Sequence, residues 1–129
     1  MHISRVKIAD WAVLKGGGIL MTIGLGSCVG VALYDVQQKI GGLAHILLSK
    51  SREFPQRAAA FNPAKFADTA IPLLVQEMER VGGKKSRLRA KIAGGSQLFM
   101  NQKIGNSVGE KNVLTTRQVL GELGIPIAG

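Results

Sequence analysis

Short apolar segments separated by glycines dominate the first half of the chain. Residues 19–23 form an apolar run between glycines, which predicts a buried strand followed by a turn. Residues 28–34 are ambiguous, because the β-branched Val29 and Val31 favour a strand, whereas Ser27 is a good capping residue for a short helix. Of the two, we predict the helix.

Two further strands flank this region. Residues 6–13 carry scattered apolar positions that predict a first strand or an irregular edge, and residues 40–48 form an apolar run that predicts a strand. Residues 49–63 are polar and contain two prolines, Pro55 and Pro63, so they predict a loop.

The second half alternates helix, strand and helix. Four apolar residues recur at the spacing of one helical face: Ile71, Leu74, Val75 and Met78. Asp68 or Thr69 is the expected cap of this helix, with Pro72 in its first turn, and the glycines at 82–83 are its expected end.

The segment after that helix completes the pattern. Apolar and basic residues alternate over 88–92, which predicts a half-buried strand. Residues 110–123 predict an amphipathic helix stopped by Gly124, and residues 125–127 begin another strand. Mixed strands and helices in this order predict a single domain of α+β class, or mixed α/β, spanning residues 1–129.

Composition and charge limit the classes of protein to which the chain can belong. The 129 residues are 46% hydrophobic, which suits one domain with a filled core. The formal net charge of +9 predicts attraction to acidic surfaces, whether nucleic acid, anionic lipid or protein. Aromatic residues are only 5%, and none lies among the basic residues of 84–91. The sequence therefore offers few side chains on which nucleic-acid bases could stack. The uncharged stretch 16–34 is about a bilayer's span in length, but its glycines favour a buried strand and loop over membrane insertion.

The densest local signal is the glycine-rich run that ends in the chain's single cysteine. The run is Gly24-Leu25-Gly26-Ser27-Cys28-Val29-Gly30. Val29 stands where a dinucleotide-binding fingerprint needs its third glycine or alanine, and the Gly-Lys-Ser/Thr of a P-loop is absent. Glycines also let backbone N–H groups approach a bound atom. The amide of Cys28 and that of a neighbour could therefore hold an oxyanion, and a helix beginning at Cys28 would favour its thiolate.

Two interpretations of this cysteine stay open at this point. A lone free cysteine in an apolar stretch is commonly a buried small hydrophobe, and a mid-strand histidine such as His45 is commonly a hydrogen-bonded core group. If Cys28 does have an imidazole partner, it is His45 by elimination, because His2 lies at the terminus. Thr22 is close in sequence to Cys28, but the residues alone do not select it as the group that orients the ring. No spacing of ligands predicts a metal or a cofactor.

Several segments resemble the CheD family of chemoreceptor glutamine deamidases. They are Thr22-Ile23-Gly24-Leu25-Gly26-Ser27-Cys28-Val29, Gly42-Leu43-Ala44-His45-Ile46-Leu47-Leu48, Lys65-Phe66-Ala67-Asp68-Thr69-Ala70, Ala90-Lys91-Ile92-Ala93-Gly94-Gly95-Ser96, Ile104-Gly105, Gly109-Glu110-Lys111-Asn112-Val113 and Gly124-Ile125-Pro126-Ile127. They cover nearly the whole chain in the order of the family. The most specific part is Gly-Ser-Cys followed at this spacing by Ala-His.

The resemblance implies an activity and a site. It places the catalytic cysteine on Cys28, the histidine on His45 and the threonine on Thr22, with Gly26 and Ser27 in the loop that would hold the oxyanion. It implies conversion of glutamines to glutamates on the cytoplasmic helices of chemoreceptors, a cytoplasmic location, and binding of a CheC-type phosphatase by some members. No cofactor, nucleic acid or membrane insertion is implied. The alternatives are a non-enzymatic basic adaptor for receptors or CheC-type proteins, and a nucleic-acid binder.

The resemblance also implies a fold. The sequence departs from the pattern of the family at two places. The fold is a β-sandwich flanked by helices in α/β/β/α layers, similar to the catalytic domain of cytotoxic necrotizing factor. Leu48-Ser49 stands where the family commonly has Leu-Pro, for which we expect a small change of the loop. The sequence stops at Gly129, where the last strands of the family would begin, so we expect those strands to be lacking.

Overall fold

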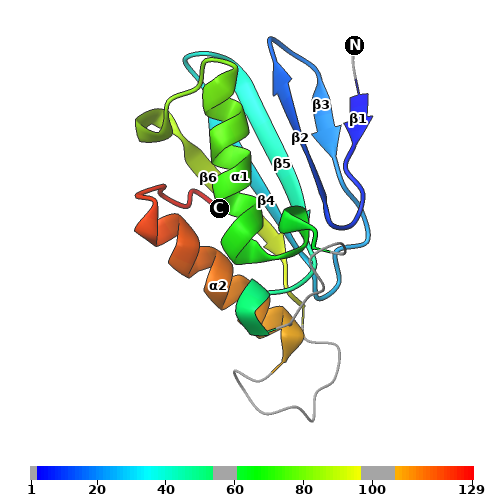
Figure 1. Ribbon diagram of the computed structural model, residues 1–129. Coiled ribbons are helices and arrows are strands. Elements are labelled where there is room, and N and C mark those ends of the chain that lie inside the picture. The colour runs from blue at the N-terminus through cyan, green and yellow to red at the C-terminus, as the bar shows by residue number, and fades with distance from the viewer. Residues whose placement is uncertain (1–2, 54–60, 97–106) are drawn as a thin grey trace.

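The computed structural model describes residues 3–53, 61–96 and 107–129, and within them it has two α-helices and two β-sheets (Figure 1). The strands are β1 (Ile3–Arg5), β2 (Asp10–Lys15), β3 (Ile19–Met21), β4 (Val29–Asp35), β5 (Ile40–Ile46) and β6 (Arg89–Gly94), and the α-helices are α1 (Ala67–Arg80) and α2 (Val108–Glu122). The mixed α and β content agrees with the predicted class.

The larger sheet has four antiparallel strands in the order β2-β5-β4-β6. Strand β4 lies inside this sheet, and its residues Val29, Val31 and Leu33 are buried in the core. The helix predicted over 28–34 is therefore wrong. Ser27 does offer a local cap, but pairing of β4 with a neighbour on each side satisfies its backbone and buries its β-branched residues, so tertiary pairing prevails.

Both helices cover one face of the larger sheet (Figure 1). The apolar face predicted for α1 is confirmed, because Ile71, Leu74, Val75 and Met78 are all buried. The backbone of β5 approaches α1 closely at Gly42, where a Cβ atom would lie only 2.8 Å from Sδ of Met78.

The predicted start of α1 is wrong by a few residues. The N-cap is Phe66, so Asp68 and Thr69 already lie in the first turn and Pro72 lies further inside the helix. The carboxylate of Asp68 accepts hydrogen bonds from the amide and hydroxyl of Ser51 instead of capping the helix. A contact distant in sequence thus uses the side chain that the local pattern assigned to the cap.

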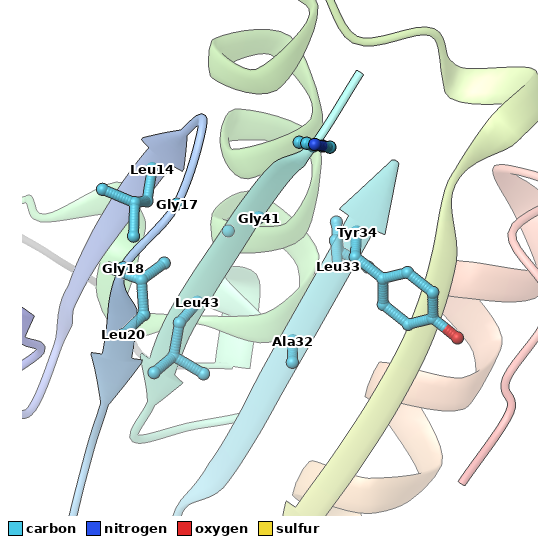
Figure 2. A pocket seen from close by; sticks show the side chains of 11 residues that line it. Leu14, Gly17, Gly18, Leu20, Ala32, Leu33, Tyr34, Gly41 and Leu43 are labelled. Atoms are coloured by element: carbon cyan, nitrogen blue, oxygen red, sulfur yellow. The ribbon is translucent and has the colours of Figure 1, made fainter. Parts of the chain in front are cut away.

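The two-stranded sheet pairs β1 with β3 in parallel. Strand β3 contacts β2 and β5, and its Leu20 lines a pocket with Leu14 and Leu43 on the sheet face opposite the helices (Figure 2). The strand predicted over 19–23 is confirmed for Ile19–Met21 only, and its predicted burial is wrong. Ile19 and Met21 are 43% and 41% exposed, because the strand lies in a small outer sheet and alternate side chains point away from the larger one. The first predicted strand, 6–13, overlaps only β2, which begins at Asp10.

The C-terminal predictions are close to the structure. Helix α2 ends at Glu122, and Gly124 follows with a φ of +73°. Residues 125–127 give one parallel bridge, between Ile127 and Ala90 of β6. The middle of the predicted loop 49–63 and the Ile104-Gly105 motif lie outside the described residues.

Within the described ranges, neither helix is both long and apolar enough to span a lipid bilayer.

Candidate active site

Three elements bring Cys28, His45 and Thr22 to one end of the larger sheet. Thr22 directly follows β3, Cys28 directly precedes β4, and His45 is the penultimate residue of β5. The β4–β5 register pairs Gly30 with His45. Side chains alternate along a strand, and extending the alternation of β4 by one residue assigns Cys28 to the same face as Gly30 and His45, which is the face opposite the helices.

Thr22 and His45 are in direct contact. Oγ1 of Thr22 lies 2.7 Å from Nδ1 of His45 and donates its own proton to the carbonyl oxygen of Val6, also at 2.7 Å. A hydroxyl has one proton to donate, so Oγ1 must accept from the ring. His45 is then the tautomer with its proton on Nδ1, and Nε2 keeps its lone pair.

The imidazole of His45 is in a position to act as a base. The residue is fully buried, and Nε2 has no hydrogen-bond partner among the described residues. Burial lowers the pKa of His45, because a charged ring would lose its hydration. The ring is therefore neutral at neutral pH, and its free lone pair can accept a proton.

The thiol of Cys28 is not the activated, helix-capping thiolate that the sequence analysis considered. The thiol is only 6% exposed, and burial raises its pKa. The expected helix dipole is absent, since Cys28 directly precedes a strand and not a helix, and Nε2 of His45 forms no hydrogen bond with the sulfur. In this conformation the thiol is protonated at neutral pH, and any activation has to come from the imidazole during the reaction.

The loop before Cys28 has the glycine conformations that the sequence suggested. Gly24 and Gly26 have φ values of +69° and +48°. The amide of Cys28 donates to the carbonyl of Leu25 at 2.6 Å, so this amide is occupied, contrary to its expected role as an oxyanion donor. The amide of Ser96, beyond β6, donates to the carbonyl of Gly26 at 2.8 Å and holds the loop against that strand.

Gly30 has no side chain, so Leu25 and Thr22 can pack closely over the backbone of β4. A Cβ atom there would lie 3.3 Å from a methyl group of Leu25 and 3.7 Å from Cγ2 of Thr22. Thr22 can therefore pack across β4 and reach the ring of His45, which faces the same glycine in the register.

An apolar pocket of about 270 Å³ lies on the same sheet face as the site. Leu43, two residues before His45, and Ala32, four residues after Cys28, lie in its floor, and Tyr34 and Leu14 lie further along (Figure 2). Thr22, Cys28 and His45 are not among the residues that line this pocket, so the pocket lies beside the site on the sheet face opposite the helices.

Comparisons with known proteins identify the family of this chain. Residues 47–129 match the family model described as "CheD chemotactic sensory transduction". A protein of Caldanaerobacter subterraneus is 49% identical over 128 residues, covering 97% of this chain and 76% of its own. The chain belongs to the CheD family.

Further members of the CheD family match this chain over a similar share of its length. A protein of Desulforamulus reducens is 46% identical over 95% of this chain and 74% of its own, and one of Pyrococcus abyssi is 48% identical over 94% and 73%. All three relatives are named "Probable chemoreceptor glutamine deamidase CheD". Matches of this coverage omit only a few terminal residues, so they include the segment that carries Thr22, Cys28 and His45.

Sequence reasoning did not identify Asn112 as part of this region of the CheD fold. Its side-chain amide, from α2, donates to the carbonyl of Ser27 at 2.9 Å and to that of Leu47 at 3.0 Å. The signal in the sequence was an amide on the inward face of a predicted amphipathic helix, where a polar group requires partners.

Proposed function

We propose that this CheD-family chain hydrolyses the side-chain amide of glutamines in chemoreceptors, giving glutamate and ammonia, with Cys28 as nucleophile and His45 as base. The names of its relatives support the reaction and the substrate. The observation that carries the assignment of residues is the hydrogen bond between Thr22 and Nδ1 of His45, because it leaves Nε2 as a free base on the face to which Cys28 points.

The first half of the proposed reaction forms a thioester. Nε2 of His45 takes the proton of the Cys28 thiol, and the sulfur attacks Cδ of the glutamine. The carbonyl oxygen becomes an oxyanion. When it collapses, the C–N bond breaks and His45 returns the proton to the nitrogen, which leaves as ammonia.

The second half consumes one water molecule. His45 takes a proton from the water, and the hydroxide oxygen attacks the thioester carbon. The C–S bond then breaks, the sulfur regains the proton, and the side chain leaves as a carboxylic acid, which loses its remaining proton to solvent to give the carboxylate. Throughout both halves the bond to Thr22 keeps the ring in one tautomer and one orientation.

The oxyanion requires donors from the loop before Cys28. The Cys28 amide is bonded to Leu25, so we assign the oxyanion to the backbone amides of Gly26 and Ser27. The Cys28 amide would join them only after its bond to Leu25 opens. Catalytic hydrogen bonds commonly tighten when substrate binds, which also applies to the contact between the thiol and Nε2.

Other expectations from the sequence stay predictions. The helices on one face of the larger sheet and the β1–β3 sheet beside the other support a layered β-sandwich. We propose a second helical layer and a likeness to the catalytic domain of cytotoxic necrotizing factor on the resemblance alone. Cytoplasmic location and binding of a CheC-type phosphatase are proposals of the same kind.

Intact-mass analysis of a chemoreceptor fragment tests the function. Incubation with the wild-type chain is expected to add about one dalton per glutamine converted, since an amide becomes an acid. Cys28→Ala is expected to abolish the change, and a Lys111→Ala variant, on an exposed part of α2, serves as a matched control of the preparation. Receptor modification that persists unchanged in Cys28→Ala would show that this cysteine is not the nucleophile and would favour the adaptor alternative.

A further inference from the structure

Asn112 is a buried amide that joins the two strands of the site. The residue lies in the second turn of α2 and is 1% exposed. Its Nδ2 donates to the carbonyl oxygens of Ser27, which directly precedes Cys28, and of Leu47, two residues after His45. One nitrogen therefore contacts both the loop of the nucleophile and the segment that follows the strand of the base.

The position of these two carbonyls explains why an amide is needed. The last pair of the β4–β5 ladder at this end is Val29 with Ile46, so the strands are no longer paired at Cys28 and Leu47. The carbonyls of Ser27 and Leu47 are both acceptors and cannot bond to each other. The NH₂ group of asparagine supplies two donors from one atom and satisfies both.

The other bonds of this region hold the loop to a different strand. The amides of Gly95 and Ser96, at the end of β6, donate to the carbonyls of Cys28 and Gly26, both at 2.8 Å. They hold the loop to β6, whereas its connection to β5, which carries His45, is the β4–β5 ladder that ends at Val29 and Ile46. Among the described residues, Asn112 is the side chain that links the loop directly to the segment following His45.

We propose that Asn112 is a positioning residue that sets the separation of the Cys28 sulfur and Nε2 of His45. This inference rests on the proposed function of that pair. Without the amide the two carbonyls are left buried and unpaired, and they separate to reach water. A displacement of about 1 Å between reacting groups can lower a rate about 100-fold, so a clamp at the strand ends affects the chemical step directly.

The decisive variant is Asn112→Asp, which keeps the shape of the side chain and replaces both donors by an oxygen. Asn112→Ser is the second variant, since its single hydroxyl can donate to one carbonyl only. Thr116→Val is the matched control. It lies one turn further along α2, is fully buried, and its hydroxyl has no partner among the described residues.

Two measurements on the full chain test the proposal. With folding verified by circular dichroism, Asn112→Asp is expected to lower kcat for receptor deamidation about 10- to 100-fold with KM within about twofold, and Asn112→Ser is expected to fall between it and the wild type. Thr116→Val is expected to match the wild type. The pH profile of Cys28 alkylation by iodoacetamide is expected to shift in Asn112→Asp and not in Thr116→Val.

Each remaining outcome is informative. Folded Asn112→Asp with unchanged kcat and an unchanged alkylation profile would overturn the proposal, as would failure of both Asn112 variants to fold, which would make the role purely structural. If the wild type deamidates nothing, the proposed function fails. The alkylation profiles then decide separately whether Asn112 positions the thiol.

Discussion

The hydroxyl of Thr22 bridges the carbonyl of Val6 and Nδ1 of His45, with both distances at 2.7 Å. This arrangement connects the segment after β1, the end of β3 and strand β5 through one oxygen. It places the ring proton on Nδ1, and so it leaves the lone pair of Nε2 free to accept a proton.

Removal of this hydroxyl is expected to impair catalysis more than folding. Thr22→Val keeps the shape of the side chain and loses the acceptor for Nδ1, so the ring can rotate or change tautomer. We expect kcat for deamidation to fall about 10- to 100-fold. Thr22→Ser retains the hydroxyl and is expected to keep most of the activity, as measured by the mass change of the receptor fragment with time. Equal activity of the valine and serine variants would contradict the role assigned to Thr22.

The thiol is expected to react slowly at neutral pH in the absence of substrate. Burial raises the pKa of Cys28, so its thiolate fraction grows only at pH values above those of an ordinary cysteine. Because the chain has one cysteine, the mass added by iodoacetamide reports Cys28 alone. We expect the alkylation rate to rise with pH and to reach its midpoint above that of free cysteine in a parallel reaction. A midpoint below that of free cysteine would mean that a preformed thiolate exists.

The acid limit of activity is expected to lie lower than for an ordinary histidine. Protonation of Nε2 removes the base, and burial lowers the pKa of His45, so the active neutral ring persists below the usual pKa of about 6.5. The charged residue nearest by register is Asp10, the partner of His45 across β2 and β5. The dependence of kcat/KM on pH measures this limit, and Asp10→Asn shows whether the carboxylate affects it. A limit clearly above 6.5 would contradict the assignment of a buried neutral base.

Gly94 is expected to be required for the backbone position of Cys28. Its φ is +92°, and a Cβ atom there would collide with the carbonyl oxygen of Cys28. Gly16 has a similar φ of +97° but open space around it, so it isolates the cost of backbone strain. We expect Gly16→Ala to lower the free energy of unfolding by about 1–2 kcal/mol. Gly94→Ala should lower it by about 1–3 kcal/mol more and also reduce kcat. Urea unfolding measures the loss of stability, and the deamidation assay measures the loss of kcat. Equal losses in the Gly16→Ala and Gly94→Ala variants would contradict the predicted collision.

Asp35 is expected to make the fold sensitive to acid. It is fully buried, forms an ion pair with Arg87 at 2.9 Å, and also accepts from the amides of Lys84 and Gln38. These partners, Arg87 first, lower its pKa from 3.8 to about 2. A lowered folded-state pKa stabilises the fold above the unfolded value, and this contribution is lost as pH falls from about 4 towards 2.

Urea midpoints measured across that range test the role of Asp35. Asp35→Asn is expected to lower the midpoint at pH 6 and to flatten its dependence on pH between about 4 and 2. Glu77→Gln is the control, because the Glu77–Arg80 pair lies largely on the surface and exposed pairs contribute little. An Asp35→Asn profile parallel to that of the wild type would exclude the ion pair as the source of acid sensitivity.

The sequence by itself determined the elements whose signal is local and periodic. The apolar face of α1, the alternation in β6 and the glycine after α2 all follow from spacing and from backbone preference, and each lies where it was predicted. The candidate residues Cys28, His45 and Thr22 were found from the motifs around them, through their resemblance to the CheD family. The contact between Thr22 and His45 did not follow from spacing, because it joins residues 23 positions apart.

The tertiary structure decided what depends on partners distant in the chain. Residues 28–34 form a strand because β5 and β6 bond it on both sides, which no local cap can outweigh. Asn112 reaches the carbonyls of Ser27 and Leu47, 85 and 65 positions away. The protonated state of the buried thiol likewise depends on its surroundings, since desolvation is set by the atoms that pack around a group and not by its neighbours in sequence.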